Sequence, residues 1–268
     1  MVTNMDRAPL DAAQLNDGLE PPFRRVELVA ETGSTNADLL ARAAAGEDVD
    51  GVVLVAEYQT AGRGRLGRSW SAPAGAQLAM SFGVAVDGVD AAEWGWLPLL
   101  TGVGVVAAVR ETGEVQAGLK WPNDILVGTK KLAGILVEVA SPRPVLIVGL
   151  GLNVTLTPAE LPDPIATSLA MLGSPMTDRN ILLSNILHEL GVRIDRWRSV
   201  GAADAELIAD YQRLSLTLGT QVRAMLPGGR QLVGVADGID QWGRLRIDTG
   251  EQLVTVSAGD ITHLRPAV

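Results

Sequence analysis

Short apolar stretches separated by tight turns occupy the middle of the chain, and this pattern constrains the fold most strongly. Residues 124–127 and 132–139 are predicted strands joined by a GTKK turn, and residues 145–156 supply another strand directly afterwards. Strands joined this closely pair antiparallel, because a parallel pair needs a long crossover. We therefore expect an α+β fold with a mixed, largely antiparallel central sheet, and not the strand–helix alternation of a doubly wound sheet.

Further strands and several helices surround this central pattern. Apolar runs predict strands at 24–30, 51–59 and 77–86, and helices are expected over 37–46, 94–110, 180–198 and 204–214. The segment 180–198 is amphipathic, whereas 94–110 is rich in small apolar residues and is expected to be buried. The helices are therefore predicted to flank the sheet.

The chain divides into three parts. Residues 1–22 are polar and end in two prolines, so we expect a flexible N-terminal tail or, as the alternative, a marginal helix stopped by the prolines. Residues 23–215 contain the strands and helices above and form one large domain. From residue 217 to 268 the pattern changes to short alternating strands at regular spacing, which predicts a small β-barrel domain.

Charge and composition exclude several classes of protein. Thirty-one acidic and 22 basic residues give a net charge of -9, so the molecule as a whole repels a phosphate backbone. The chain has no cysteine and two histidines, which excludes disulfides, thiol nucleophiles and histidine-rich metal sites. No export signal is visible, and the uncharged runs at 94–109 and 144–159 have only 16 residues each, short of the roughly 20 that a membrane-spanning helix needs. These features predict a cytoplasmic protein without a membrane span.

A segment rich in arginine and glycine, GRGRLGRSW at 62–70, is the most unusual part of this acidic sequence. It matches the GxGxxG dinucleotide motif formally, but Pro73 and Gly75 leave no room for the helix that this motif requires. A dinucleotide oxidoreductase is therefore disfavoured. The segment is predicted to be an anion-binding loop, with backbone amides and guanidinium groups that grip carboxylate or phosphate. Trp70 beside it could stack on a nucleobase.

Four other motifs have both a structural and a functional interpretation. KWPND at 120–124 fits a turn that presents a carboxylate, and KLAGILVE at 131–138 is a strand interrupted by a glycine. STN at 34–36 fits a helix N-cap but also offers polar groups to a ligand, and GLGLN at 149–153 fits close packing of a strand. Each of these motifs alone is weak support for a binding site.

Together and in this order, the motifs resemble those of the biotin protein ligases. The resemblance runs from about residue 25 to 170, and the small C-terminal β-domain fits the same family. It implies a biotin/lipoate ligase-like catalytic domain followed by an SH3-like β-barrel. The winged helix-turn-helix of the repressor-type members is missing from the sequence, so DNA binding is not expected.

The resemblance implies a reaction in two steps. Biotin and Mg-ATP would form biotinoyl-5′-AMP and pyrophosphate, and biotin would then pass to one lysine of a biotin carboxyl carrier protein domain of an acyl-CoA carboxylase. Mg²⁺ would arrive with ATP, and no metal site of the protein itself is expected. A carboxylate that attacks a phosphate needs cations and amides to offset the repulsion between the two anions.

The resemblance implies a role for individual residues of this chain. Lys131, Arg65 and Asp124 would be catalytic, with Lys131 bridging carboxylate and α-phosphate and Asp124 orienting or deprotonating the acceptor lysine. Biotin would contact Ser34, Thr35, Asn36, Gln59, Arg63, Gly64, Arg65, Lys131 and Gly134. ATP and the adenylate would contact Gly62, Arg63, Arg65, Trp70, Lys131 and Asn153.

Two alternatives stay open. A lipoate or octanoyl ligase would share the fold class, although it is not expected to carry both GRGRLGRSW and KWPND. A non-enzymatic RNA-binding protein could use the same arginine–glycine loop. Such proteins normally combine a basic groove with several stacking aromatic residues.

Overall fold

The computed structural model describes residues 7–226, 229, 231–257 and 260–263 of the 268. Its larger part is built on a seven-stranded sheet with the order β1-β2-β3-β7-β6-β5-β4. The neighbours β1 and β2 run parallel, and the other neighbouring strands pair antiparallel. The prediction of an α+β fold with a mixed, largely antiparallel sheet is therefore confirmed.

Most predicted elements begin and end within a few residues of their expected positions. The strands of this sheet are β1 (Arg25–Thr32), β2 (Val52–Gln59), β3 (Gln77–Ala85), β4 (Gly118–Lys120), β5 (Asp124–Val127), β6 (Lys130–Val139) and β7 (Val145–Asn153). The α-helices are α1 (Ala12–Asp17), α2 (Thr35–Ala44), α3 (Leu97–Gly113), α4 (Arg179–Val200) and α5 (Ala205–Leu214). Short 3₁₀ turns occur at Arg65–Gly67, Ala91–Trp96, Pro158–Glu160 and Ala170–Leu172.

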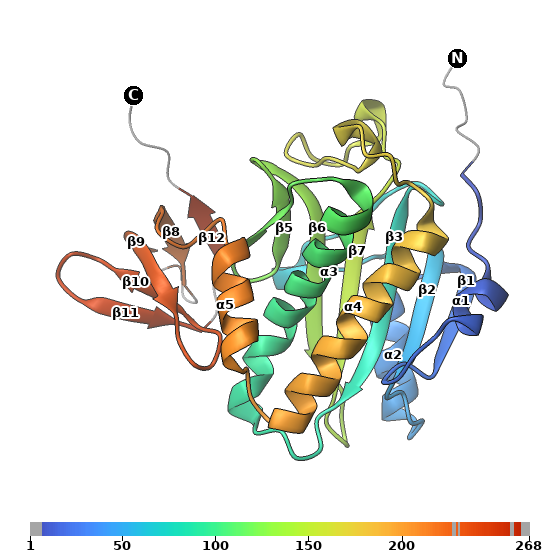
Figure 1. Cartoon of the computed structure of the whole chain (residues 1–268), viewed down its shortest axis with the longest axis horizontal. Helices are drawn as coiled ribbons and strands as arrows, with labels where there is room; N and C mark the ends of the chain where they lie inside the picture. Colours follow the sequence, from blue (N-terminus) through green and yellow to red (C-terminus); the bar gives the residue numbers. More distant parts are fainter. Residues whose placement is uncertain (1–6, 227–228, 230, 258–259, 264–268) are drawn as a thin grey trace.

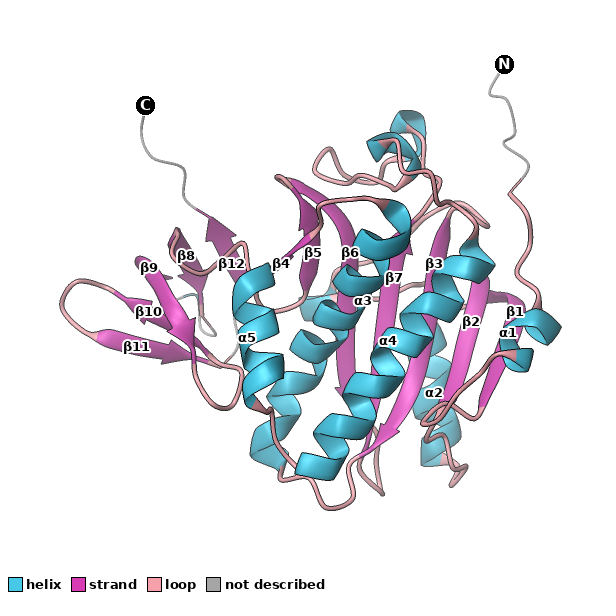
Figure 2. Cartoon of the chain, viewed as in Figure 1, coloured by secondary structure: helices cyan, strands magenta, loops and turns pink. Residues whose placement is uncertain are grey.

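Helices α3 and α4 cover one face of the sheet, and α2 lies on the other face (Figures 1 and 2). Glycines in α3 allow close packing on both sides, because a Cβ at Gly104 would stand 2.8 Å from Leu190 of α4 and a Cβ at Gly102 would stand 2.8 Å from Leu119. The segment Ala91–Gly113 is long and apolar enough to cross a membrane, yet 67% of its most apolar window is buried inside the structure. It is therefore placed as the core helix of this layer.

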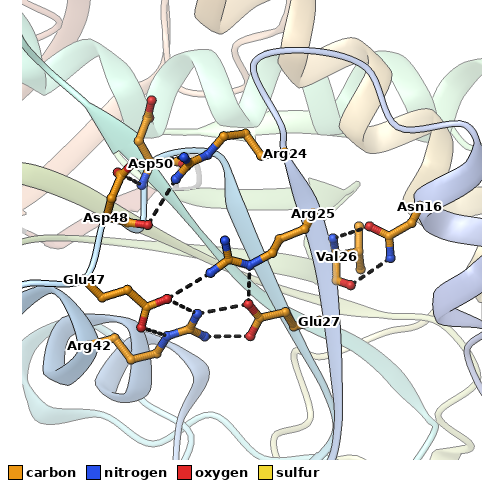
Figure 3. A network of polar contacts seen from close by, with 9 residues as sticks. All are labelled: Asn16, Arg24, Arg25, Val26, Glu27, Arg42, Glu47, Asp48 and Asp50. Carbon is orange, nitrogen blue, oxygen red and sulfur yellow. Dashed lines mark hydrogen bonds and ion pairs between the residues drawn. The ribbon is translucent and has the colours of Figure 1, made fainter.

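The segment 7–22 differs from the loose tail expected from the sequence. Leu10 and Leu15 are buried, and Asp11 caps the N-terminus of α1 by accepting from Ala13 and Gln14. Asn16 both accepts from the Val26 amide and donates to the Val26 carbonyl, so this segment covers part of the exposed edge of β1 (Figure 3). The sequence suggested otherwise because a six-residue helix has little propensity of its own and is held by tertiary contacts.

The C-terminal part forms a second, five-stranded antiparallel sheet with the order β11-β10-β9-β8-β12. Its strands are β8 (Gln221–Met225), β9 (Gln231–Ile239), β10 (Leu245–Asp248), β11 (Leu253–Val256) and β12 (Asp260–His263). Two tryptophans of the large domain hold the turn before β10. Trp96 donates to the Gln241 carbonyl at 2.7 Å, and Trp121 donates to the Gly243 carbonyl at 3.0 Å.

Candidate active site

A cavity of about 610 Å³ opens on the sheet face that carries α2. Its floor is the backbone of β3, β6 and β7, where side chains are small or absent. Ser81 pairs with Gly149, and in the next row Ala79 pairs with Gly151, which pairs with Gly134. In these two rows β3, β6 and β7 carry only one large apolar side chain, Leu136 beside Gly149, so other groups can lie against the backbone.

A chain of buried polar groups forms one end of the cavity, at the N-terminus of α2. Gln59 accepts from the Thr35 amide at 2.9 Å, and the Thr35 hydroxyl lies 2.6 Å from that of Ser81. Ser81 donates to Asn36, and Asn36 donates to Glu138 at 2.9 Å. Ser34 is the N-cap residue, but its side chain makes no capping bond. Capping alone therefore does not explain STN at this position.

The arginine–glycine segment folds as a narrow hairpin over the cavity and contains no α-helix, in agreement with the rejection of the dinucleotide motif. The Trp70 amide donates to the Gly62 carbonyl at 2.8 Å, and the Gly64 amide donates to the Arg68 carbonyl at 2.7 Å. A Cβ at Gly62 would stand 2.3 Å from the Trp70 carbonyl oxygen, so only glycine fits there. At the tip, Leu66 has a positive φ of 57° and is 74% exposed.

Two arginines of this hairpin reach the opposite strands. Arg63 pairs with Glu138 of β6 at 2.9 Å, and Arg65 donates to Asn123 at 3.1 Å. Asn123 in turn donates to the Ile135 carbonyl at 2.9 Å. The hairpin is thereby attached to KWPND and to β6 across the cavity.

Trp70 lies flat against the cavity floor. A Cβ at Gly151 would stand 2.3 Å from the Trp70 ring, and a Cβ at Gly134 would stand 3.3 Å from it. The indole donates to the Gln77 side chain at 2.6 Å, and Lys131 Nζ lies 5.5 Å from the ring centroid. The glycine inside β6 and one of those in GLGLN are thus explained by the space that this ring takes.

Lysines and a carboxylate occupy the wall formed by β4, β5 and β6. Asp124 Oδ1 lies 2.6 Å from Lys131 Nζ, and the second oxygen lies 3.7 Å from Lys120 Nζ. The three groups are partly buried, with 19% to 24% of each side chain exposed. The only other lysine of the whole chain is Lys130, which donates to the Pro164 carbonyl at 2.6 Å. Two of the three lysines of this acidic protein therefore line the site.

The far end of the cavity is closed by the segment after β7. The Lys131 amide donates to the Ile165 carbonyl at 2.6 Å, and the Thr167 amide donates back to the Lys131 carbonyl at 2.9 Å. Asn153, which is buried, donates to the Thr167 carbonyl at 2.9 Å. This segment thus contacts two of the residues singled out from the sequence.

The structure brings nearly all the sequence-predicted site residues together. The residues that line the cavity are Ser34, Thr35, Asn36, Gln59, Arg63, Gly64, Arg65, Trp70, Asp124, Lys131, Gly134 and Asn153. Gly62 lies behind them under the Trp70 backbone. Five basic side chains line the cavity against two acidic ones, namely Arg63, Arg65, Arg68, Lys120 and Lys131 against Asp124 and Asp163. The cavity is a basic island in a chain of net charge -9.

Sequence reasoning missed Ser81, Glu138 and the segment 162–166. Ser81 lies in an ordinary strand without any local signal, whereas Glu138 is the last residue of the KLAGILVE motif. Among the described residues, no group of three or more His, Asp or Glu side chains could hold a metal ion.

Comparison with known proteins agrees with this geometry. Residues 32–154 match the family model "Biotin/lipoate A/B protein ligase family", and residues 217–264 match "Biotin protein ligase C terminal domain". The chain is 52% identical to a biotin–[acetyl-CoA-carboxylase] ligase of Mycobacterium tuberculosis, over 97% of both chains.

Two solved structures extend the similarity to three dimensions. A biotin protein ligase from Aquifex aeolicus in complex with biotin and ATP superposes with a TM-score of 0.76 at 29% identity, covering 91% of this chain and 100% of that one. A ligase from Leishmania major in complex with biotinyl-5-AMP superposes at 0.61 with 27% identity, covering 89% and 100%. On sequence and structure alike, this chain belongs to the biotin protein ligase family.

Proposed function

We propose that this protein activates biotin with ATP and transfers it to a lysine of a biotin carboxyl carrier protein domain. The observation that carries the proposal is the basic cavity itself. It places Lys131 and two arginines above a glycine floor, with the buried Thr35–Ser81–Asn36 chain at one end. Such a site can hold two anions and a polar ring together.

In the first step a biotin carboxylate oxygen attacks the α-phosphorus of ATP, and the bond to the β-phosphate oxygen breaks to release pyrophosphate. Negative charge gathers where the two anions meet. The Lys131 ammonium and the Arg63 and Arg65 guanidinium groups stabilise it, because fixed cations in a partly buried site cost little reorganisation. Biotin lies towards Ser34, Thr35, Asn36 and Gln59 in this proposal, with Gly64 near it and Gly134 beside the Trp70 ring.

The nucleotide occupies the other half of the cavity. Trp70 covers the adenine and Asn153 helps to hold the nucleotide, with Gly62 allowing the hairpin to close tightly. The triphosphate brings its own Mg²⁺, which adds charge neutralisation at the phosphate oxygens. The support for this half is the position of Trp70 and Asn153 beyond the polar end. The Trp70 ring lies against Gly151, two residues along β7 from Gly149, and Asn153 lies four residues along.

In the second step the neutral ε-amine of the carrier lysine attacks the acyl carbon, AMP leaves, and the amine loses a proton. Asp124 is the proposed group that orients this amine and takes the proton. Its place in the cavity wall supports the role: one oxygen is held 2.6 Å from Lys131 Nζ, and the other, 3.7 Å from Lys120 Nζ, can accept a hydrogen bond from the incoming amine. The carrier protein and a cytoplasmic location are part of the same proposal.

A lipoate or octanoyl ligase is the second candidate of the same fold. The first family model covers both types of enzyme, but the C-terminal model and the 52% identical relative are specific to biotin ligases. The RNA-binding alternative has less support, because the arginines of the hairpin reach inwards to Glu138 and Asn123.

The test uses the purified full chain with biotin, ATP, Mg²⁺ and a carrier domain. We expect pyrophosphate release that depends on biotin, and carrier-bound biotin detectable with streptavidin. Lipoate or octanoate in place of biotin is the matched control. Modification with these acids but not with biotin would overturn the proposal in favour of the second candidate.

A further inference from the structure

The N-terminal segment Arg7–Asp11 crosses the molecule beside the candidate active site and makes contacts that the proposed reaction does not use. We call this segment the strap. It lies against β2, the turn at 74–75 and the segment after β7. These three parts of the chain are far apart in sequence, and the strap touches all of them.

The strap is held by a buried arginine of α4. Arg179, 5% exposed, donates to the Ala8 carbonyl at 2.7 Å and to Glu57 of β2 at 2.6 Å. The other oxygen of Glu57 accepts from the Leu10 amide at 2.8 Å. A buried charge with this many partners fixes the path of the strap, because each lost bond would leave a buried polar group unsatisfied.

With the strap held in this position, Arg7 contacts the segment that closes the cavity. Its Nε donates to the Thr155 hydroxyl at 3.0 Å, and its Nη2 donates to the Thr155 carbonyl at 3.1 Å and to Glu160 at 2.7 Å. Only 14% of the Arg7 side chain is exposed. Burial opposes ionisation of Glu160, but hydrogen bonds from Thr157 and Arg7 outweigh it and lower the pKa of Glu160.

The segment that Arg7 holds is attached to the site at its other end. Residues 165–167 form a ladder with Lys131 and accept from Asn153, as described above. The same segment contributes Pro162, Asp163, Ile165 and Ala166 to the cavity wall. Arg7 therefore contacts one end of a short stretch of chain whose other end holds Lys131 and Asn153.

We infer that Arg7 is a positioning residue for the nucleotide half of the site. It acts through the segment 155–167 and touches no reacting group. The polar end at Thr35 and Gln59 belongs to α2 and β2, and among the described residues the hydrogen bonds of these two side chains do not involve this segment. This inference rests on the proposed function, and it predicts that loss of the Arg7 contacts affects the binding of ATP far more than that of biotin.

The test compares Arg7→Ala with wild type in steady-state pyrophosphate release. We expect the KM for ATP to rise by about five- to tenfold, with less than a twofold change in the KM for biotin, since coupling through such a network alters binding by factors of this size. Arg7→Lys keeps the ion pair with Glu160 but not the fork onto Thr155, so an intermediate KM for ATP is expected. Equal changes in both KM values, or none, would overturn the inference.

A matched control is Asp11→Ala, which removes the cap of α1 without touching the segment 155–167. It is expected to lower thermal stability while leaving the KM for ATP unchanged. If Asp11→Ala raises the KM for ATP as much as Arg7→Ala does, the effect is general destabilisation and the inference is wrong.

Hydrogen exchange of the ligand-free protein separates this inference from the proposed function. In Arg7→Ala the amides of the segment 155–167 should exchange faster, whereas those of α2 should not change. Unchanged exchange over 155–167 overturns the inference about Arg7 even in an active enzyme. A wild type that releases no pyrophosphate from biotin and ATP overturns the proposed function instead.

Discussion

At the scale of single residues, the site depends on the absence of side chains as much as on their presence. A Cβ at Gly149 would stand 2.3 Å from Asn36 Oδ1, and a Cβ at Gly151 would meet the Trp70 ring at the same distance. Each glycine of GLGLN therefore makes room for one functional side chain from elsewhere in the chain. The motif shapes the floor of the cavity, and its glycines need no phosphate-binding role of their own.

Lys131 is the residue for which the largest catalytic loss is expected. Lys131→Ala should lower the single-turnover rate of adenylate formation by on the order of 10²-fold or more, the scale seen when one preorganised donor to a developing charge is removed. Rapid-quench measurement of labelled biotinoyl-AMP checks this. Lys131→Arg keeps the positive charge and should lose less, and Arg213→Ala on the surface of α5 is the remote control. Near-normal adenylation in Lys131→Ala would remove Lys131 from the proposed mechanism.

Arg65 is expected to act in retention of the intermediate. It reaches from the hairpin to Asn123 at 3.1 Å, so Arg65→Gly removes one of the contacts that attach the hairpin to the opposite wall and leaves the Arg63–Glu138 pair in place. Release of the adenylate should become roughly tenfold faster or more, because a charge-assisted contact is lost. Filter binding with labelled adenylate measures the rate. If release is as slow as in wild type, Arg65 does not hold the intermediate.

At the scale of elements, an ion-pair network fixes α2 on the sheet and thereby the position of Thr35 and Asn36. Arg42 of α2 makes two hydrogen bonds to Glu27 of β1, at 2.7 and 3.0 Å, and also pairs with Glu47 (Figure 3). The hydrogen bonds from Arg42, and then those from Arg25, lower the pKa of Glu27 from 4.5 to about 2 against the effect of burial. Helix α2 begins in the site, and its C-terminal end is thus held by the ion pairs of Arg42.

This network predicts a specific dependence of stability on pH. Because the pKa of Glu27 is lower in the folded state than in the unfolded state, its stabilising effect is full above about pH 4.5 and is lost as the pH falls towards 2. Glu27→Gln should remove that part of the acid sensitivity. A third of the Glu27 side chain is exposed, so the change in the free energy of unfolding at pH 7 should stay below about 1 kcal/mol.

Urea unfolding at pH 7 and at pH 4 measures this difference. Glu31→Gln, an exposed position on the same strand, is the matched control and should leave the pH dependence as in wild type. A Glu27→Gln protein with an unchanged pH profile would show that the network adds nothing to stability.

At the scale of the whole molecule, the two domains are joined next to the site. Trp121 precedes the turn that carries Asn123 and Asp124, and its indole donates to the Gly243 carbonyl of the C-terminal domain. The Trp121 amide also donates to Thr217 at 3.0 Å, so this residue contacts the C-terminal part of the chain twice. The C-terminal domain is therefore anchored to the loop that bears the proposed base.

Trp121→Phe should loosen this anchor. The Gly243 carbonyl would lose its buried donor, which costs about 1–3 kcal/mol of stability at the junction. Hydrogen exchange across 239–247 should accelerate in Trp121→Phe. Trp94→Phe removes an indole bond inside the large domain and is the control. Equal exchange over 239–247 in both variants would mean that Trp121 does not anchor the domain.

Local patterns in the sequence were sufficient for the strands, for the long helices and for the residue types of the site. Alternation and turn residues predict β5, β6 and β7 because these signals lie within a few neighbouring residues. The order of the motifs, which matches that of the family, likewise predicts Lys131, Arg63, Arg65 and the polar triplet STN as site residues without any knowledge of tertiary contacts. The C-terminal β-domain was recognisable from the same short-range pattern.

Only the tertiary structure decided where Trp70, Ser81, Glu138 and the segment 155–167 lie relative to these motifs. Their contacts join residues from about 45 to 150 positions apart, such as Ser81 with Asn36 and Arg7 with Thr155, and no local periodicity encodes such pairs. The packed N-terminal strap is the clearest example. A polar segment beside two prolines favours a tail on its own, and a buried arginine 170 residues later holds it in place.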